Sequence, residues 1–468
     1  MQSETDQAMQ LNAEFIKQTQ RIFADESELM LGAIMEKSPE VSIRINPAKV
    51  APARLGELAR VPWCPSGAYL TERPQFTFDV DFQAGNYYVQ DASSMFIEQV
   101  LTQLVKTPVR YLDLCAAPGG KTTAALAVLP KGSLVVANEI VPARVKVLAQ
   151  NVEKWGAGNC VVSSNSPASF GALTHYFDVV AADVPCSGEG MFRKDDEAVA
   201  QWTPQLVDEC AARQRTIVCD AWKALRPGGL FIYSTCTYNT AENEDMVAYM
   251  AETLGAEPLA IDVDSSWGIH GAVKGCFPCY RFLPHLVRGE GLFMCVMRKP
   301  DDEPVKNVMR QKKKLGNRPK GETAPGEVKA WLTGEYSFVV FDDHMVAFPR
   351  EFADDLPVLA KNLRLLHDGT LVGVRKGRNI VPAQQLAWAV DYAKQAFATH
   401  EVDYATAISF LQRQTLAVDA PRGYVLLTHR SVPLGFINNL GTRANNLYPK
   451  EYRILSQHIP DQEPRVLL

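Results

Sequence analysis

The sequence lacks the features that would place it in a membrane or outside the cell. None of its 468 residues forms part of an uninterrupted apolar run of about 18, which excludes an ordinary membrane-spanning helix. The opening segment MQSETDQAMQLNAEF has no basic stretch followed by an apolar run and a cleavage site, so a secretory signal is not expected. The ten cysteines are scattered, which favours free thiols over a disulfide framework. We therefore expect a cytoplasmic protein that does not engage a membrane.

A strong positive charge is also absent. The formal net charge is −5, so no overall field attracts the chain to nucleic acid or anionic lipid, and any such partner must bind at local patches. The 47% apolar and 22% charged residues are close to globular averages, which excludes a fully disordered or fibrous protein. No internal repeat is evident, and the length allows about three domains.

Short apolar runs alternate with helical patterns between residues 109 and 299. The expected strands are 109–115, 133–139, 159–164, 177–183, 230–235 and 291–299, and the expected helices are 121–129, 142–155, 205–225 and 241–254. This alternation predicts an α/β fold, a Rossmann-like parallel sheet with helices on both faces. Ligands of such sheets bind beyond the carboxyl ends of the strands.

Three further segments flank this region. Residues 1–95 mix helix and strand signals and are expected to form an N-terminal α+β module, with the sheet domain at 96–300. Residues 301–325 lose apolar periodicity and are expected to be a linker, followed by one or two small domains at 326–468. Residues 301–320 hold seven basic and three acidic side chains, a net charge of +4. A solvated tether is the favoured interpretation, and phosphate contact through Lys312, Lys313 and Lys314 is the alternative.

The segment DLCAAPGGKT (113–122) ends like a phosphate-binding loop but departs from its pattern. Such a loop has a glycine in the position that Cys115 fills here, and Pro118 removes one amide donor. What remains is a strand, a turn of small residues that a bulky ligand can approach closely, and a helix N-terminus. A plain turn without a ligand is the alternative.

An acidic residue follows about 20 residues later, where the next expected strand ends at Glu139. A carboxylate at this position suits the two hydroxyl donors of a ribose. A loop that lacks full phosphate chemistry, together with an acid for ribose, indicates a nucleoside ligand without phosphates. S-adenosylmethionine is the commonest cofactor of that kind.

Two cysteines follow two other expected strands. Cys186 lies in Asp183-Val-Pro-Cys, and Cys236 lies in Thr-Cys-Thr. The predicted parallel sheet brings both cysteines to the carboxyl ends of the strands, where the turn of residues 115–121, here called the glycine loop, is also expected. An isolated cysteine is usually a small core residue. Methylation of cytosine C5, however, needs a thiolate that adds to C6. We expect Asn239 or Thr240 to cap a helix just after Cys236, whose dipole would favour that thiolate.

Four motifs in order, DLCAAPGGKT, NE, DVPCSGEG and YSTCTYNTAENE, resemble the Sun and Nop-two family of RNA cytosine-C5 methyltransferases. SIRINP (42–47), YYVQDASSM (87–95) and RFLPHLVRGEGLF (281–293) extend the similarity over residues 40–300. The resemblance implies an S-adenosylmethionine-dependent enzyme with a class I methyltransferase sheet. It also implies that Cys236 is the nucleophile and that Cys186 assists product release.

The same resemblance implies roles for further residues. Asp183 would face cytosine near N3 and the amino group, and would also border the cofactor. The remaining cofactor-binding positions would be Cys115, Ala116, Ala117, Pro118, Gly119, Gly120, Lys121, Glu139 and Ser166. Many members carry an Asp for adenine where this chain has Asn165 and Ser166, so the adenine contact differs here.

The segment 424–453 resembles the PUA-like end domain of the bacterial small-subunit ribosomal RNA methyltransferase F group. This resemblance implies RNA contact by both terminal modules. The candidate phosphate partners are Arg44, Arg443 and Lys450, although an exposed Arg is often only solvated. We expect a monomer that turns the target base out of structured RNA, either small-subunit ribosomal RNA or the assembled subunit.

Several alternatives remain open. An exocyclic amino methyltransferase usually has Pro-Pro where this chain has Pro185-Cys186, and Cys115 disfavours a nucleotide-triphosphate-driven RNA remodeller. A transfer RNA cytosine-C5 methyltransferase and a non-catalytic RNA-binding scaffold are the others. The segment CFPC (276–279) has the spacing of half a zinc site without a second pair, so we expect structural thiols and no metal.

Overall fold

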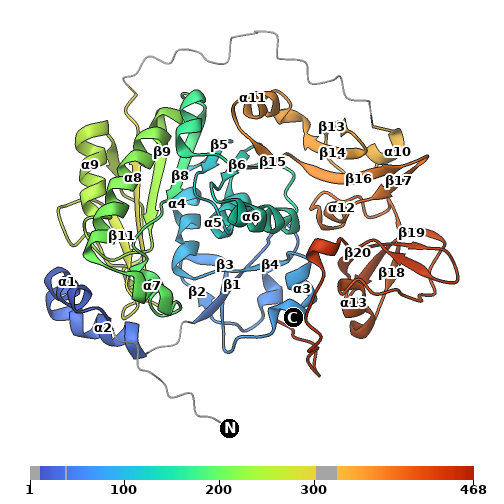
Figure 1. Cartoon of the computed structure of the whole chain (residues 1–468), viewed down its shortest axis with the longest axis horizontal. Coiled ribbons are helices and arrows are strands. Elements are labelled where there is room, and N and C mark those ends of the chain that lie inside the picture. The colour runs from blue at the N-terminus through green and yellow to red at the C-terminus, as the bar shows by residue number, and fades with distance from the viewer. Residues whose placement is uncertain (1–10, 37–39, 302–323) are drawn as a thin grey trace.

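A large sheet occupies the centre of the computed structural model, which describes residues 11–36, 40–301 and 324–468 (Figure 1). Among these residues the sheet has nine strands, in the order β10-β12-β9-β8-β5-β6-β7-β15, with β11 paired to β12. The strands are β5 (Arg110–Asp113), β6 (Leu134–Asn138), β7 (Cys160–Ser163), β8 (Phe177–Asp183), β9 (Leu225–Thr235), β10 (Glu257–Leu259), β11 (Cys279–Phe282), β12 (Leu292–Arg298) and β15 (Leu365–His367). The five strands from β9 to β7 run parallel, whereas β12 runs antiparallel to β9.

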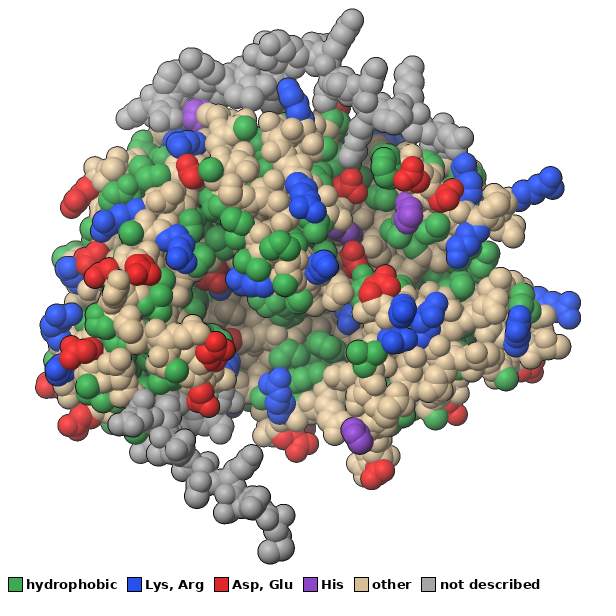
Figure 2. All heavy atoms as spheres, in the orientation of Figure 1, with side chains coloured by type: hydrophobic (Ala, Val, Ile, Leu, Met, Phe, Trp, Pro, Cys, Tyr) green, Lys and Arg blue, Asp and Glu red, His purple; other side chains and the backbone are tan. Residues whose placement is uncertain are grey.

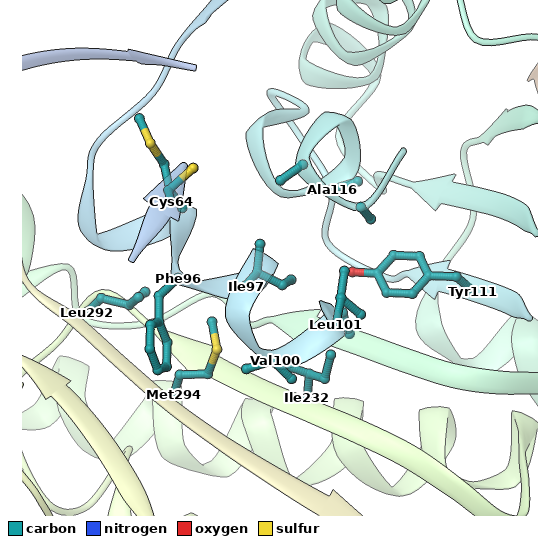
Figure 3. Close-up of a cluster of buried hydrophobic side chains, with 14 of the residues drawn as sticks. Cys64, Phe96, Ile97, Val100, Leu101, Tyr111, Ala116, Ile232, Leu292 and Met294 are labelled. Carbon is teal, nitrogen blue, oxygen red and sulfur yellow. The ribbon is translucent and has the colours of Figure 1, made fainter. Parts of the chain in front are cut away.

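Helices cover both faces of this sheet. They are α4 (Ile97–Leu104), α5 (Gly120–Val128) and α6 (Pro142–Trp155) on one face, and α8 (Pro204–Ala224) and α9 (Glu244–Leu254) on the other. Figure 3 shows Val100 and Leu101 of α4 packed over Ile232 of β9. On the opposite face Val218 of α8 is buried in a cluster with Val180 of β8. The predicted Rossmann-like α/β fold is confirmed.

Two local signals explain where the central helices begin and end. Helix α6 starts at a proline, which lacks an N–H group, but no N–H of the first helical turn has a partner within the helix. The helix ends before Gly156, and this glycine adopts the left-handed conformation. Helix α8 starts after Thr203, whose side chain accepts a hydrogen bond from Leu206 N. Because the central strands are parallel, the segments that follow β5, β6, β8 and β9 all leave the sheet on the same side, at the carboxyl ends of the strands. We call this side the strand-end edge of the sheet.

The N-terminal residues that the structure describes form three α-helices and a small sheet with the order β2-β3-β1-β4. The elements are α1 (Ala13–Phe23), α2 (Ser27–Glu36), β1 (Val41–Ile45), β2 (Arg60–Val61), β3 (Cys64–Leu70), α3 (Val80–Gln83) and β4 (Tyr87–Val89). Phe15 of α1 lies 4.9 Å from the ring of Phe192 and 5.4 Å from that of Trp202. Helix α1 therefore packs on the segment between β8 and α8.

Arg44 of β1 was a candidate phosphate ligand, and that prediction is wrong. Its side chain is fully buried. The guanidinium donates to the side chains of Gln90 and Thr123 over 2.8 and 2.6 Å, lies 4.7 Å above the ring of Trp155, and is 3.6 Å from the carboxylate of Glu98. Arg44 therefore joins the small sheet to the start of α5 and cannot reach RNA.

We expect Arg44→Met to lower the free energy of unfolding by about 3–5 kcal/mol, because the buried carboxylate of Glu98 would lose its cationic neighbour. Urea denaturation followed by circular dichroism measures this change. Arg60→Met, which removes an exposed arginine of β2, is the matched control. Equal stability of the two variants would contradict the assignment of Arg44 as a structural residue.

The C-terminal residues form two further sheets, β13-β14-β16-β17 and β18-β19-β20-β21. The strands are β13 (Tyr336–Phe341), β14 (His344–Pro349), β16 (Thr370–Lys376), β17 (Asn379–Pro382), β18 (Ala398–Glu401), β19 (Gly423–His429), β20 (Val432–Asn439) and β21 (Ala444–Asn446). The helices are α10 (Gly326–Lys329), α11 (Asp355–Asn362), α12 (Gln384–Trp388) and α13 (Tyr404–Leu411). None of the helices in the described ranges is long and apolar enough to span a membrane.

Strand β15 belongs to the C-terminal region but joins the central sheet. It pairs antiparallel with β7, with Leu365 opposite Ser163. The central sheet thus extends across the domain limit expected at residues 301–325. The domain limits themselves stay a prediction, and the candidate RNA-binding residues Lys312, Lys313 and Lys314 lie outside the described residues.

Candidate active site

The two cysteines that follow β8 and β9 lie together. These strands are parallel neighbours, with Asp183 opposite Ser234, so the chain leaves both at the same edge. The Sγ atoms of Cys186 and Cys236 are 3.1 Å apart, both thiols are free, and Cys236 N donates to Cys186 Sγ over 3.3 Å. The contact with Cys236 and burial raise the pKa of Cys186 well above its ordinary value. Cys186 therefore keeps its proton at neutral pH and can donate it toward Cys236 Sγ.

A buried polar network fixes the two cysteine-bearing turns against each other. Glu189 accepts hydrogen bonds from the backbone N–H groups of Tyr238 and Asn239 over 2.7 and 2.9 Å. Glu242 accepts from Ser187 N over 3.0 Å and from the Asn239 side chain over 2.8 Å. Both carboxylates are completely buried. Because each one bridges the segment after Cys186 to the segment after Cys236, the network sets the position of the two sulfurs.

A lysine and an aspartate border the cysteine pair. Lys121 Nζ lies 2.8 Å from Asp183 Oδ2, and Ser234 Oγ donates to Asp183 Oδ1 over 2.7 Å. Burial alone would lower the pKa of Lys121, but the carboxylates of Asp183 and Asp113 raise it above its ordinary value. Lys121 therefore stays charged and is already paired, which disfavours a role as the phosphate lysine of a nucleotide-triphosphate site.

The turn between β5 and α5 is built from small residues. Gly119 adopts a φ of 114°, which other residues rarely adopt, and Ala116 and Ala117 are buried with small side chains. Burial raises the pKa of the Cys115 thiol well above its ordinary value, so this third cysteine is a neutral wall rather than a thiolate. Figure 2 shows that the surface is hollowed between α5 and α7 (Asp196–Gln201), on either side of this edge.

Glu139 follows β6 at the same edge. Its carboxylate is buried, accepts a hydrogen bond from Val141 N over 2.9 Å and lies 3.6 Å from Arg144. Arg144 in turn donates to Ala117 O over 2.8 Å, which links the acid to the glycine loop. An acid next to a turn of small residues fits the ribose of a nucleoside.

The helix expected just after Cys236 begins later than predicted. Helix α9 starts at Glu244, and its N-cap residue Asn243 makes no side-chain capping bond. The side chain of Asn239 accepts from Glu242 N over 2.9 Å and so stabilises a turn instead. The predicted cap by Asn239 or Thr240 is wrong, because this segment closes the buried network before the helix starts.

Comparisons with known proteins agree with this geometry. The family of 16S rRNA methyltransferase RsmB/F matches residues 103–298, the N-terminal domain of 16S rRNA methyltransferase RsmF matches 11–92, and the methyltransferase RsmF PUA domain matches 397–454. Ribosomal RNA small subunit methyltransferase F of Serratia proteamaculans is 30% identical over 439 residues, which are 88% of this chain and 89% of the relative. The chain belongs to the ribosomal RNA small subunit methyltransferase F family. The predicted resemblance and the prediction of an RNA methyltransferase are confirmed.

Solved structures show the fold that this methyltransferase F family member shares. A methyltransferase homolog protein from Pyrococcus horikoshii is 24% identical, with a TM-score of 0.54 over 62% of this chain and 96% of that protein. NSun6 from the same organism is 20% identical, with a TM-score of 0.54 over 62% of this chain and 98% of that protein. At these identities the similarity shows the shared fold alone.

The segment after β7 carries Asn165 and Ser166, where many relatives of this methyltransferase F family member have an Asp for adenine. Asn165 accepts a hydrogen bond from Arg364 N over 3.0 Å and donates to Arg364 O over 3.3 Å. Its amide therefore holds the chain that enters β15. Ser166 is exposed, with its Oγ 3.2 Å from that of Ser169, and its cofactor role stays a prediction.

The remaining RNA-binding candidates lie at the surface. Arg443 and Lys450 are both exposed, near the end of the PUA match. Figure 2 shows Lys and Arg side chains interspersed with Asp and Glu on the face in view, in keeping with a net charge of −5. Contact of Arg443 and Lys450 with RNA stays a prediction.

Two carboxylates that organise this methyltransferase F site are not predicted from the sequence. Glu189 and Glu242 both lie inside the quoted motifs, in DVPCSGEG and TYNTAENE. Their signal was a charged residue within a turn next to a buried strand, which we would ordinarily interpret as solvated. Gln214 of α8 was missed as well, although it donates to Glu242 over 2.7 Å from the middle of a long helix.

The CFPC segment is not part of this site. Cys276 is exposed, while Cys279 is buried and pairs in the sheet register with Cys295. Within residues 11–36, 40–301 and 324–468, no group of three or more His, Cys, Asp or Glu side chains could hold a metal ion.

Proposed function

We propose that this protein transfers the methyl group of S-adenosylmethionine to C5 of cytosine in small-subunit ribosomal RNA, through a covalent bond between Cys236 and cytosine C6. The observation that carries the proposal is the 3.1 Å contact of Cys186 Sγ and Cys236 Sγ beside the Lys121–Asp183 pair. Two thiols that meet next to a cofactor-type loop have no role in methylation of an amino group. They match the needs of methylation at a ring carbon.

The chemistry assigns a task to each side chain. Cytosine C5 is a weak nucleophile until Cys236 Sγ adds to C6 and converts the ring into an enamine. Asp183 would hold the base by hydrogen bonds near N3 and the amino group, and Lys121 would keep that carboxylate oriented. After C5 has gained the methyl group, a base removes the C5 proton and the bond between C6 and Cys236 Sγ breaks. The S–H of Cys186 would stabilise the departing thiolate by a hydrogen bond.

The residues at the glycine loop fit S-adenosylmethionine, which supplies the methyl group when bound. The turn from Cys115 to Lys121 presents small side chains, so a bulky nucleoside can approach the backbone. The buried carboxylate of Glu139 is the acceptor for the ribose hydroxyls. These residues would bind and orient the cofactor at the strand edge that also carries the two thiols.

We expect Glu139→Gln to weaken binding of S-adenosylmethionine about tenfold or more, because one hydrogen-bond acceptor for the ribose is lost. The amide oxygen of Gln can still accept from Val141 N, so the local fold is preserved. Isothermal titration calorimetry measures the affinity, and Glu252→Gln on the exposed side of α9 is the control. Unchanged affinity of the Glu139 variant would contradict the ribose assignment.

The substrate is tested by transfer of a labelled methyl group to isolated small-subunit ribosomal RNA, to the assembled subunit and to transfer RNA. Mass spectrometry of nuclease digests then identifies the product. We expect 5-methylcytosine in the ribosomal substrates. Label in an exocyclic amino group, in transfer RNA alone, or in no RNA would favour the amino methyltransferase, the transfer RNA enzyme and the RNA-binding scaffold, respectively.

A further inference from the structure

A second concave site lies among the C-terminal elements. A cavity of about 750 Å³ opens between α10, β17, the segment before β18, and β19. Its lining residues are Glu327, Ala330, Trp331, Arg378, Asn379, Ile380, Ala393, Gln395, Ala396, Phe397 and Tyr424. Figure 1 places these elements at the opposite side of the molecule from β8 and β9. The cavity is therefore separate from the cysteine pair.

Aromatic side chains form one wall of this cavity. The rings of Trp331 and Phe397 are 4.9 Å apart, and Phe397 also packs edge-on against Phe436 at 5.0 Å. These contacts fix the orientation of Phe397. Tyr424 of β19 is half-buried, and burial raises its pKa above its ordinary value, so its hydroxyl stays neutral and can donate a hydrogen bond. Flat side chains held in this way suit the face of a planar ring.

The rim of the cavity is polar and carries both signs of charge. Among the described residues, the exposed side chains of Arg378 and Gln395 make no hydrogen bond or ion pair, so both can bind a ligand. Lys376 and Lys394 are exposed close to them in the sequence, and Glu327 is the acid of the lining. A guanidinium beside aromatic rings binds a phosphate while the rings contact a base.

We propose that this cavity holds one unpaired nucleotide of the RNA substrate, with its base on Tyr424 and Phe397 and its phosphate at Arg378. The inference rests on the proposed function, which makes RNA the partner. The concave shape admits a base that has left its helix, whereas a paired base could not enter. A local basic and aromatic site also explains how a chain with a net charge of −5 retains RNA.

The test measures the affinity of the full-length protein for fluorescein-labelled oligouridine and oligoadenosine by fluorescence anisotropy. We expect Tyr424→Ala to weaken binding about 5- to 100-fold through loss of stacking, and Tyr424→Phe to bind nearly as the parent does. Arg378→Gln should weaken binding and lower the slope of the logarithm of affinity against the logarithm of salt by about one. The matched controls are Phe341→Ala and Arg350→Gln, which alter exposed residues outside the cavity.

Crosslinking locates the nucleotide without relying on a variant. Oligouridine that carries 4-thiouridine should crosslink to the peptides that contain Phe397 or Tyr424. Equal affinity of all the variants, crosslinks that lie only elsewhere, or no oligonucleotide binding by the parent protein would overturn the proposal. The proposed function is judged separately, by S-adenosylmethionine binding and methyl transfer, because neither measurement requires this cavity.

Discussion

Cys236→Ala should reduce methyl transfer to RNA by at least about 10⁴-fold, the size of loss expected when a catalytic nucleophile is removed. Without addition at C6, cytosine C5 has too little electron density to attack a methyl donor. Cys186 cannot replace the missing thiol efficiently, because burial still raises the pKa of Cys186 after the contact with Cys236 is lost. Initial rates with labelled S-adenosylmethionine and small-subunit ribosomal RNA measure the effect.

The control for this prediction is Cys276→Ala, which removes an exposed cysteine far along the chain from both strand ends. It should keep the parent rate. Thermal melting should show that the Cys236 variant remains folded, and its affinity for S-adenosylmethionine should be unchanged. A Cys236→Ala protein that forms 5-methylcytosine at the parent rate would refute the nucleophile assignment and the proposed mechanism with it.

Cys186→Ala should trap the protein on its RNA. The Cys236 sulfur can still add to C6 in this variant, but the departing thiolate loses the hydrogen bond from the neighbouring S–H, 3.1 Å away. The adduct should therefore accumulate as a protein–RNA band that survives heating in detergent. Single-turnover methylation should persist, while multiple turnover should fall by about 10²-fold or more.

The double variant, Cys186→Ala with Cys236→Ala, is the control for the adduct. It should form no such band, because the sulfur that bonds to C6 is gone. Free turnover by the Cys186→Ala protein without accumulation of the band would contradict the release role. A band that persists in the double variant would show that another nucleophile forms the adduct.

The sequence alone predicted the cysteine pair because parallel sheets obey a strong rule. The motifs around Cys186 and Cys236 each followed an apolar strand, and in a wound parallel sheet all such strands end at one edge. The same rule placed Lys121 and Glu139 at that edge. This prediction needed only the order of strands and helices along the chain, and the spacing of apolar residues indicates that order.

Burial of charged residues could not be predicted in the same way. Arg44 appeared to be a surface arginine, because the sequence does not show that Gln90, Thr123 and Glu98 surround it. Glu189 likewise appeared to be a solvated turn residue. In each case the partners lie far away in the chain, and a single sequence gives no signal for contacts of that kind. Local sequence patterns thus predicted which residues meet at the carboxyl ends of the strands. The buried hydrogen-bond network that supports these residues is seen only in the three-dimensional structure.

Strand β15 has a consequence for the synthesis of this protein on the ribosome. Its pairing joins Leu365 to Ser163, so about 200 residues separate the two strands in the chain. At a translation rate of about 5–20 residues per second, β7 waits roughly 10–40 s for its neighbour. During that interval β7 is an open edge with unpaired backbone groups, which favours association with other nascent chains. We therefore expect chaperones to bind the nascent central sheet until the C-terminal region has emerged from the ribosome.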